Sequence, residues 1–240
     1  MKITGKKILV TGGATGIGLG MVAQFLADNN TVIICGRRPE VLAEAQKTHS
    51  TLITHPCDLS SAKEREALYQ WLAANHSDLE VLVNNAGIQN WMHIAEDDFM
   101  TRAQQEIQTN IEAPIHLTKL LLQLPAITII MNVTSGLSFM PLAKVGVYSA
   151  TKAFMHSFTL SLRHMLRDRH IRVIEVIPPA LNTDLGGKGL HDAAPPVQDF
   201  IHAIFLQIAE GKDELTWGFS EKMHQATPAE IKATFDKMNG

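Results

Sequence analysis

The sequence has few of the features that mark secreted, membrane-spanning or zinc-binding proteins. Only two of its 240 residues are cysteines, Cys35 and Cys57, and they form no Cys-x-x-Cys pair, so we expect buried free thiols and no bound metal. No apolar run approaches the ~20 residues of a membrane span, and no signal-peptide core precedes the first apolar run. We therefore expect a cytoplasmic protein with no membrane partner.

A strong charge of either sign is also missing. Charged residues make up 19% of the chain and the formal net charge is −3, which argues against nucleic acid as a dominant partner. Hydrophobic residues, by contrast, make up 45%, enough for a large core. Because no internal repeat, low-complexity tract or linker divides the chain, we expect residues 1–240 to form one domain.

Short β-branched runs alternate with longer amphipathic stretches along the chain. The runs are almost continuously apolar, as in parallel sheets that helices cover on both faces. This alternation predicts an α/β protein with a single-domain Rossmann fold, that is, a doubly wound parallel sheet with helices on both faces. Strands are expected at Ile8–Thr11, Thr31–Gly36, Leu52–Pro56, Val81–Asn84, Ile127–Val133 and Arg172–Ile177. Helices are expected at about 17–29, 39–48, 61–75, 98–124 and 149–169.

Two later segments break this rhythm. Leu181–Pro196 is rich in Gly, Asn, Asp and Pro and follows the sixth expected strand. Since ligands of parallel sheets bind beyond the carboxyl ends of strands, we expect a mobile substrate loop at about 181–196. Near the end of the chain, Thr227-Pro228-Ala229-Glu230 combines a capping threonine, a proline at the first helical position and a glutamate three residues after the cap. This pattern predicts the start of a terminal helix.

A glycine-rich turn, Gly12-Gly13-Ala14-Thr15-Gly16-Ile17-Gly18, follows the first expected strand and leads into helical periodicity. Glycines let the backbone turn tightly and approach a pyrophosphate, and the helix N-terminus offers free N–H groups and the positive end of its dipole. Glycine is common in turns, so a plain strand-to-helix turn remains an alternative. The position near the N-terminus favours a dinucleotide site.

The end of the second strand indicates which dinucleotide is bound. Sites for NAD usually place a carboxylate about 20 positions beyond the glycines, but Cys35-Gly36-Arg37-Arg38 contains none. The planar, permanently charged arginine fork suits a phosphate. We therefore expect NADP(H) in preference to NAD(H), with Arg37 as the first and Arg38 as the second candidate for its 2′-phosphate. A solvated helix start is the alternative explanation.

Tyr148-Ser149-Ala150-Thr151-Lys152 places a phenol and an ammonium four residues apart at a predicted helix start, so both can lie on one helix face. A tyrosine with a pKa near ~10 is a poor base at neutral pH unless a nearby cation favours the phenolate. On spacing alone, a core tyrosine beside a surface lysine is the better explanation.

Four motifs taken together resemble the short-chain dehydrogenase/reductase family. They are the dinucleotide turn, Asn84-Asn85-Ala86-Gly87, Ser135, and Tyr148-x-x-x-Lys152, in the family's order and spacing. The resemblance extends over about residues 6–183. Stretches such as Val32–Arg37 and His156–Leu160 are also similar to the branch of this family that is encoded with lipoteichoic acid D-alanylation genes. The resemblance implies a nicotinamide-dependent enzyme that interconverts a small-molecule carbonyl compound and an alcohol.

The resemblance also implies roles for individual residues. Tyr148 would protonate the carbonyl oxygen as hydride arrives, Lys152 would lower the pKa of Tyr148 and bind the nicotinamide ribose, and Ser135 would polarise the carbonyl. Asn110 matches the helix asparagine whose backbone position holds a water of the proton relay. Asp58 would bind the adenine amino group. The full set of implied cofactor contacts is Gly12, Thr15, Gly16, Ile17, Gly18, Arg37, Arg38, Asp58, Asn85, Ala86, Gly87, Tyr148, Lys152, Pro178, Leu181 and Thr183.

Two features depart from the family pattern. Pro178-Pro179 stands where Pro-Gly is usual, which removes a flexible residue and a backbone N–H beside the expected nicotinamide. The usual C-terminal strand that ends in Asp-Gly-Gly is missing, and a shorter strand is expected near Glu214–Gly218.

Other functions remain open. A sensor or scaffold that binds NADP(H) without catalysis is one alternative, although a binding role needs no complete set of Ser135, Tyr148, Lys152 and Asn110. Epimerase or dehydratase chemistry on the same scaffold is another.

The helices at 98–124 and 149–169 carry surplus apolar residues, and in the family this pair forms an interface, so a homodimer or homotetramer is expected. The sequence does not name the substrate.

Overall fold

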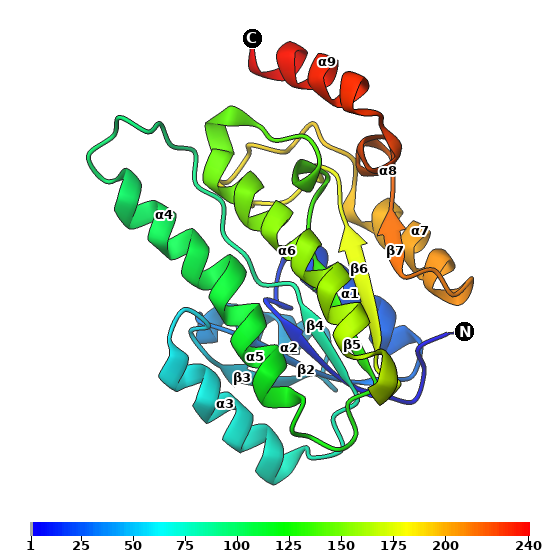
Figure 1. Cartoon of the computed structure of the whole chain (residues 1–240). Helices are drawn as coiled ribbons and strands as arrows, with labels where there is room; N and C mark the ends of the chain where they lie inside the picture. Colours follow the sequence, from blue (N-terminus) through cyan, green and yellow to red (C-terminus); the bar gives the residue numbers. More distant parts are fainter. Residues whose placement is uncertain (1) are drawn as a thin grey trace.

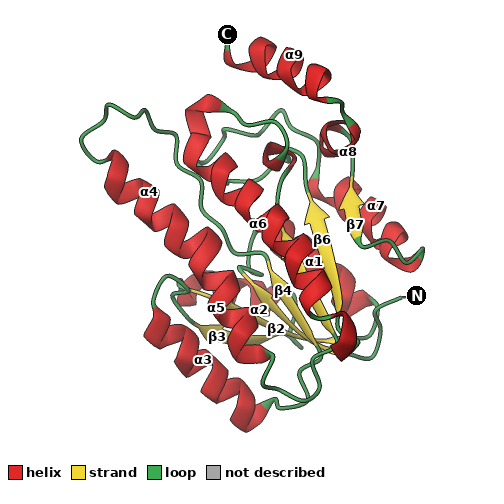
Figure 2. Cartoon of the chain, in the orientation of Figure 1, coloured by secondary structure: helices red, strands yellow, loops and turns green. Residues whose placement is uncertain are grey.

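The structure is a computed structural model that describes residues 2–240, and its centre is a seven-stranded sheet (Figures 1 and 2). All neighbouring strands are parallel, and their order is β3-β2-β1-β4-β5-β6-β7. The strands are β1 (Lys7–Thr11), β2 (Thr31–Gly36), β3 (Ile53–Pro56), β4 (Val81–Asn84), β5 (Ile129–Val133), β6 (Arg172–Ile177) and β7 (Glu214–Thr216). The prediction of a doubly wound Rossmann fold is confirmed.

Helices cover both faces of this sheet (Figure 1). The helices along the chain are α1 (Gly16–Ala27), α2 (Pro39–Thr48), α3 (Ala62–Asn75), α4 (Phe99–Ile107), the π-helical turn η1 (Gln108–Glu112), α5 (Ala113–Leu121), α6 (Gly146–Met165), α7 (Val197–Ala209), α8 (Phe219–Gln225) and α9 (Pro228–Asn239), of which α9 lies away from the sheet. Apolar side chains of α1, α2 and α7 form one core layer, and those of α3, α5 and α6 form the other.

Strand geometry explains why the strands are apolar at almost every position. In β1, Ile8 and Val10 belong to the core layer of α1, α2 and α7, whereas Leu9 between them belongs to the opposite layer. Successive side chains of a strand point to opposite faces. Both sets are buried, because helices lie on each side, and burial of apolar area is the main force that holds the layers together.

The helix expected at 98–124 is present in three parts. α4 runs to Ile107, η1 follows, and α5 ends at Leu121. Pro114 lies in the first turn of α5 and has no N–H, so an α-helical bond to the carbonyl of Asn110, four residues earlier, cannot form. A wider turn therefore interrupts an otherwise continuous helix at Asn110, as π-helical turns often do at functional sites.

The C-terminal region contains both confirmed and missed elements. β7 lies in the stretch expected to form a short strand, and α9 starts with the expected capping box, in which Thr227 Oγ1 accepts from the N–H of Glu230 and Glu230 Oε2 accepts from the N–H of Thr227. Helices α7 and α8 were not predicted. α7 packs so closely on α1 that a Cβ at Gly20 would lie 2.9 Å from side-chain atoms of Val197 and Ile201.

The cysteines are buried and unpaired, and burial is the main cause that raises the pKa of both thiols. Within residues 2–240, no helix is long and apolar enough to cross a membrane. The same residues contain no group of three or more His, Cys, Asp or Glu side chains placed to hold a metal ion.

Candidate active site

The residues singled out in the sequence lie at one edge of the sheet. Gly12 follows β1, Asn85 follows β4, Ser135 comes shortly after β5, and Pro178 follows β6. Because the strands are parallel, their carboxyl ends meet at the same edge, and β1 and β4 flank the point where the strand order reverses. Ligands of open α/β sheets bind in the crevice at such a point.

The turn after β1 tolerates only glycine at its key positions. Gly12 and Gly16 have φ values of +63° and +53°, which favour glycine. A Cβ at Gly18 would lie 2.4 Å from the carbonyl oxygen of Gly12 and 2.5 Å from Asn85 Nδ2. Thr15 precedes α1 without a side-chain cap, and Ile17 lies in the helix's first turn, which contains no acidic residue. The first N–H groups of α1 are therefore available to an anion such as a pyrophosphate.

Asn85 and Ala86 fix this turn against the segment after β4. The side-chain amide of Asn85 donates to the carbonyl oxygens of Thr11 (2.9 Å) and Gly12 (3.2 Å). In return, Thr11 Oγ1 accepts from the N–H groups of Asn85 (2.9 Å) and Ala86 (3.0 Å). The amide donor of Asn85 is thus occupied by the protein's own backbone, so Asn85 shapes the site through these bonds.

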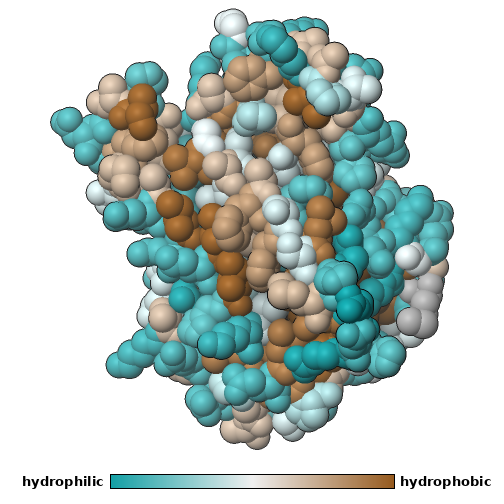
Figure 3. All heavy atoms as spheres, viewed as in Figure 1, coloured by the Kyte–Doolittle hydropathy of each residue, from teal (hydrophilic) through white to brown (hydrophobic). Residues whose placement is uncertain are grey.

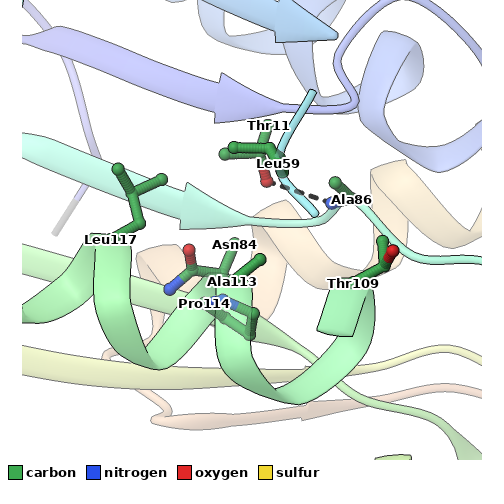
Figure 4. A pocket seen from close by; sticks show the side chains of 8 residues that line it. All are labelled: Thr11, Leu59, Asn84, Ala86, Thr109, Ala113, Pro114 and Leu117. Carbon is green, nitrogen blue, oxygen red and sulfur yellow. Dashed lines mark hydrogen bonds between the residues drawn. The ribbon is translucent and has the colours of Figure 1, made fainter. Parts of the chain in front are cut away.

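A small cavity lies behind this junction (Figure 4). Its volume is about 10 Å³, which is room for about one water molecule and far too little for a dinucleotide. Its walls come from the ends of β1 and β4 and from the start of α5, and they include Thr11, Asn84, Ala86 and Pro114. This cavity is therefore a packing feature beside the expected cofactor cleft.

The arginines after β2 are exposed and free to bind an anion. In the described part of the chain, residues 2–240, the side chains of Arg37 and Arg38 form no hydrogen bond or ion pair. Asp58, which follows the neighbouring strand β3, already accepts at Oδ1 from the N–H (3.0 Å) and hydroxyl (2.8 Å) of Ser60. The region expected to hold the adenosine end of a dinucleotide thus contains two unpaired arginine side chains. One of the two carboxylate oxygens of Asp58 is already hydrogen-bonded.

Three elements, β5, α6 and η1, bring the proposed catalytic residues together. Ser135 lies after β5, Tyr148 and Lys152 lie on α6, and Asn110 lies in η1, and all are at most 8% exposed. Lys152 Nζ donates to the carbonyl oxygen of Val133 (2.8 Å) and lies 5.6 Å from the centroid of the Tyr148 ring. The alternative that Lys152 is a surface residue is therefore wrong.

Asn110 joins the segment after β4 to α6. Its side chain exchanges two 2.9 Å hydrogen bonds with the backbone of Ile88 and donates to Thr151 Oγ1 (3.1 Å). A Cβ at Gly87 would lie 3.3 Å from Asn110 Oδ1 and 3.5 Å from Lys152 Nζ, so the chain passes closely between these two residues. Since Pro114 cannot donate to it, the carbonyl of Asn110 lacks the donor that an α-helix would supply.

Burial dominates the titration of this cluster. It raises the pKa of Tyr148, a hydrogen bond with the Ser135 side chain opposes this, and the charge of Glu106 raises that pKa further. Burial also lowers the pKa of Lys152 to about 8. The expected lowering of the Tyr148 pKa by Lys152 is therefore not observed in the chain alone, where loss of solvation outweighs every favourable contact of the phenolate.

The segment after β6 lies over this edge of the sheet. Pro178 is buried and its carbonyl oxygen accepts from the N–H of Gly136 (2.9 Å), while Ser220 Oγ donates to the carbonyl oxygen of Ile177 (2.5 Å). These bonds give the Pro178-Pro179 backbone a defined path. Leu181 is buried, and the Thr183 side chain would lie 3.3 Å from a Cβ at Gly16, so the loop returns to the glycine turn.

Two buried glutamates of this region were not predicted. Glu106 is fully buried on α4 and accepts at Oε1 from the N–H (2.5 Å) and side-chain amide (3.1 Å) of Asn90. Glu175 is fully buried in β6 and accepts from Thr134 Oγ1 (2.7 Å), and it pairs with His156 Nδ1 (2.9 Å). Glu106 could have been noticed in the sequence, because it lies four residues before Asn110 on the same helix face.

Comparison with known proteins agrees with this geometry. The short chain dehydrogenase family matches residues 6–193. The chain belongs to the short-chain dehydrogenase/reductase family. This short-chain dehydrogenase/reductase is 41% identical to the oxidoreductase DltE of Bacillus subtilis (strain 168), over 100% of this chain and 98% of DltE, which confirms the expected branch.

Two further proteins are less similar in sequence than DltE. The NADP-dependent 3-hydroxy acid dehydrogenase YdfG of Salmonella typhi is 32% identical over 71% of each chain. The crystal structure of a short-chain dehydrogenase from Burkholderia cenocepacia J2315 in complex with NADP superposes on this short-chain dehydrogenase/reductase with a TM-score of 0.85. That likeness covers 99% of both chains at 22% identity, and it shows a shared fold.

Proposed function

We propose that this oxidoreductase uses NADP(H) to interconvert a carbonyl compound and an alcohol, with Tyr148 as the acid/base. The observation that carries the proposal is the convergence of Ser135, Tyr148 and Lys152 in one buried cluster beside Asn110. A protein that only binds a nucleotide gains nothing from burying a lysine and a tyrosine side by side, because burial of a charged group is costly.

A nicotinamide held at this site would supply or accept the hydride, and the chain's own residues handle the proton. In reduction, the Tyr148 phenol donates its proton to the carbonyl oxygen, and the Ser135 hydroxyl donates a hydrogen bond to the same oxygen. Lys152 is protonated below a pH of about 8, and its charge favours the phenolate that remains. The carbonyl of Asn110, which receives no hydrogen bond from Pro114, offers an acceptor for a water through which Tyr148 regains a proton.

The preference for NADP(H) is supported by the free arginines. Arg37 and Arg38 follow β2 at the position where an NAD site needs a carboxylate, and they are exposed. Gly12, Gly16 and Gly18 allow the tight turn that leads into α1, whose uncapped N-terminus suits a pyrophosphate. The name of YdfG and the complex from Burkholderia cenocepacia both specify NADP, and this supports the same cofactor here.

The wider setting of the site is part of this proposal. Residues 1–240 act as one domain, the loop at 181–196 covers the substrate, and the protein works in the cytoplasm. Apolar side chains are exposed along α4 and α6, among them Ile107, Phe154 and Leu160, and the space-filling view shows an apolar band over these helices (Figure 3). Such a band is suited to a contact between copies of the chain, in a homodimer or homotetramer.

The Tyr148→Phe variant tests the proposed chemistry. It removes one hydroxyl and keeps the ring, so NADPH should bind with unchanged affinity, while oxidation of NADPH should be lost across a panel of ketones and aldehydes. Unchanged turnover in this variant would refute the role of Tyr148. If the wild-type chain binds NADPH tightly and oxidises it with no carbonyl compound, the alternative of a non-catalytic NADP(H) sensor or scaffold is favoured.

A further inference from the structure

Glu106 occupies a position where the fold leads one to expect an apolar side chain. The inward face of this helix carries Ala103, Glu106 and Asn110, all buried, whereas Gln105 and Ile107 are exposed. Glu106 Oε1 is bound to Asn90, and Oε2 is buried with no hydrogen-bond partner in residues 2–240. An uncharged side chain would avoid this loss of solvation, so a carboxylate at this position requires an explanation.

The two helices place Glu106 near Tyr148. α4 and its continuation η1 lie beside α6 (Figure 1), and Asn110 Nδ2 bonds to Thr151 Oγ1. Glu106 lies about one helical turn before Asn110, and Tyr148 lies about one turn before Thr151. The carboxylate therefore lies at the level of the phenol, and its charge acts on Tyr148.

The charges around Tyr148 act in opposite directions. Lys152 on α6 lies 5.6 Å from the ring centroid, and a cation so close is expected to favour the phenolate. Ser135 beside β5 bonds to the phenol. Asn110 in η1 is neutral, and Glu106 on α4 favours the protonated phenol. Arg102, one turn before Glu106, is bonded to Glu96, Asp98 and the carbonyl of Trp91, so its charge is shared with other acceptors.

We propose that Glu106 is a positioning residue of this site, which holds the segment after β4 through Asn90 and places a negative charge beside Tyr148 so that the phenol stays protonated and ready for carbonyl reduction. The proposal rests on the proposed function of Tyr148. Carboxylic acids ordinarily titrate far below phenols, and burial raises the pKa of both groups here, so we expect Glu106 to lose its proton before Tyr148 does. The effect therefore persists over the whole titration of the phenol.

The experiment uses the fact that the chain contains two tyrosines, Tyr69 and Tyr148. Growth with a fluorinated tyrosine lowers both phenol pKa values into a range where the protein stays folded, and fluorine NMR then follows each ring in the full-length chain. Tyr69→Phe assigns the two signals. Glu106→Gln keeps an acceptor for Asn90 but removes the charge. Glu112→Gln removes an exposed charge from the same helical stretch and is the matched control.

In Glu106→Gln, we expect the Tyr148 signal to titrate at lower pH than in the wild type, with the Tyr69 signal unchanged. Glu112→Gln should leave both signals unchanged. Equal Tyr148 titration in the wild type and Glu106→Gln, or an equal shift in Glu112→Gln, would overturn the proposal. If Glu106→Gln does not fold, Glu106→Met, which fills a similar volume without charge, is measured by the same criteria.

Asn90→Ala tests the other half of the proposal, because it removes the side-chain hydrogen bond to Glu106 Oε1 (3.1 Å) and keeps both the charge and the bond from the backbone N–H of residue 90. The Tyr148 signal should titrate at the same pH as in the wild type, and the KM should rise for any carbonyl compound that is turned over. An unchanged KM would refute the contribution of the Asn90 side chain to holding this segment. The NMR titration needs no turnover, so its failure refutes only the role of Glu106, whereas retained turnover in Tyr148→Phe refutes the proposed function.

Discussion

Replacing Lys152 by methionine should stabilise the protein while it abolishes activity. The side chain is 5% exposed, and burial lowers its pKa from the ordinary 10.5 to about 8. At about 1.4 kcal/mol per pKa unit, holding the charged lysine in the fold costs about 3 kcal/mol at neutral pH. Methionine also loses the hydrogen bond to the Val133 carbonyl, worth about 1 kcal/mol. The net gain in the free energy of unfolding is about 2 kcal/mol.

The pH dependence identifies the cause of this gain. Between pH 8 and 10.5 the unfolded chain holds the lysine proton and the folded chain does not, so the wild type gains stability relative to Lys152→Met as pH rises through this window. At pH 10, holding the charged Lys152 in the fold still costs about 1 kcal/mol. This equals the contribution of the hydrogen bond that methionine lacks, so the wild type and Lys152→Met should be equally stable at that pH.

Urea and thermal unfolding of the cofactor-free chains at pH 7, 8, 9 and 10 measure the effect. At pH 7, Lys152→Met should melt about 4–8 °C above the wild type. Lys119→Met, at an exposed lysine of α5, is the matched control and should change the free energy of unfolding by less than about 0.5 kcal/mol. A Lys152→Met protein no more stable than wild type at pH 7, or a gain that persists undiminished to pH 10, would refute the reasoning.

Two further predictions concern the cofactor site. Arg37→Asp should weaken NADPH binding about 10- to 100-fold, because one charge-assisted contact is lost, and should leave NADH binding almost unchanged. If a fluorescence titration shows equal loss of affinity for both cofactors, Arg37 does not bind the 2′-phosphate. Gly18→Ala should lower the free energy of unfolding by about 1–3 kcal/mol and abolish cofactor binding, because its Cβ would meet the Gly12 carbonyl oxygen at 2.4 Å. Gly146→Ala, where a Cβ meets no atom within 4 Å, is the control for that variant, and equal effects at the two positions would contradict the steric argument.

The sheet could be predicted because its physical signal is local and repeated. Every strand from β1 to β6 is a short apolar run between helical patterns, and the predicted and observed strands differ by at most two residues at either end. The interruption at η1 was not predicted, although its cause, Pro114, is visible in the sequence. A proline in the first turn of a helix is common, so it signals a break only when the helix is known to continue on both sides.

The catalytic set could be predicted from motif order, but its surroundings could not. Ser135, Tyr148 and Lys152 carry recognisable spacing, whereas the bond from Asn110 to Thr151 joins residues 41 positions apart. The sequence predicted a cofactor contact for Asn85 but not its structural role. Its amide donates to the backbone of Thr11 and Gly12, which lie 74 and 73 positions away in the sequence. Such contacts depend on how strands and helices are arranged in space, and local sequence carries no information about that arrangement.

The placement of opposite charges around Tyr148 follows a consistent physical logic. A phenol that must donate a proton and then take it back needs a neighbour that favours each state. Lys152 favours the phenolate, and its lowered pKa reflects the cost of keeping it buried. Glu106 favours the phenol, and its pKa is raised, chiefly by burial. Both charges reduce the stability of the fold, and such a cost is expected where selection has favoured activity over stability. Removing either charge should therefore shift Tyr148 toward the state that the other charge favours, and Lys152→Met and Glu106→Gln should move the Tyr148 pKa in opposite directions.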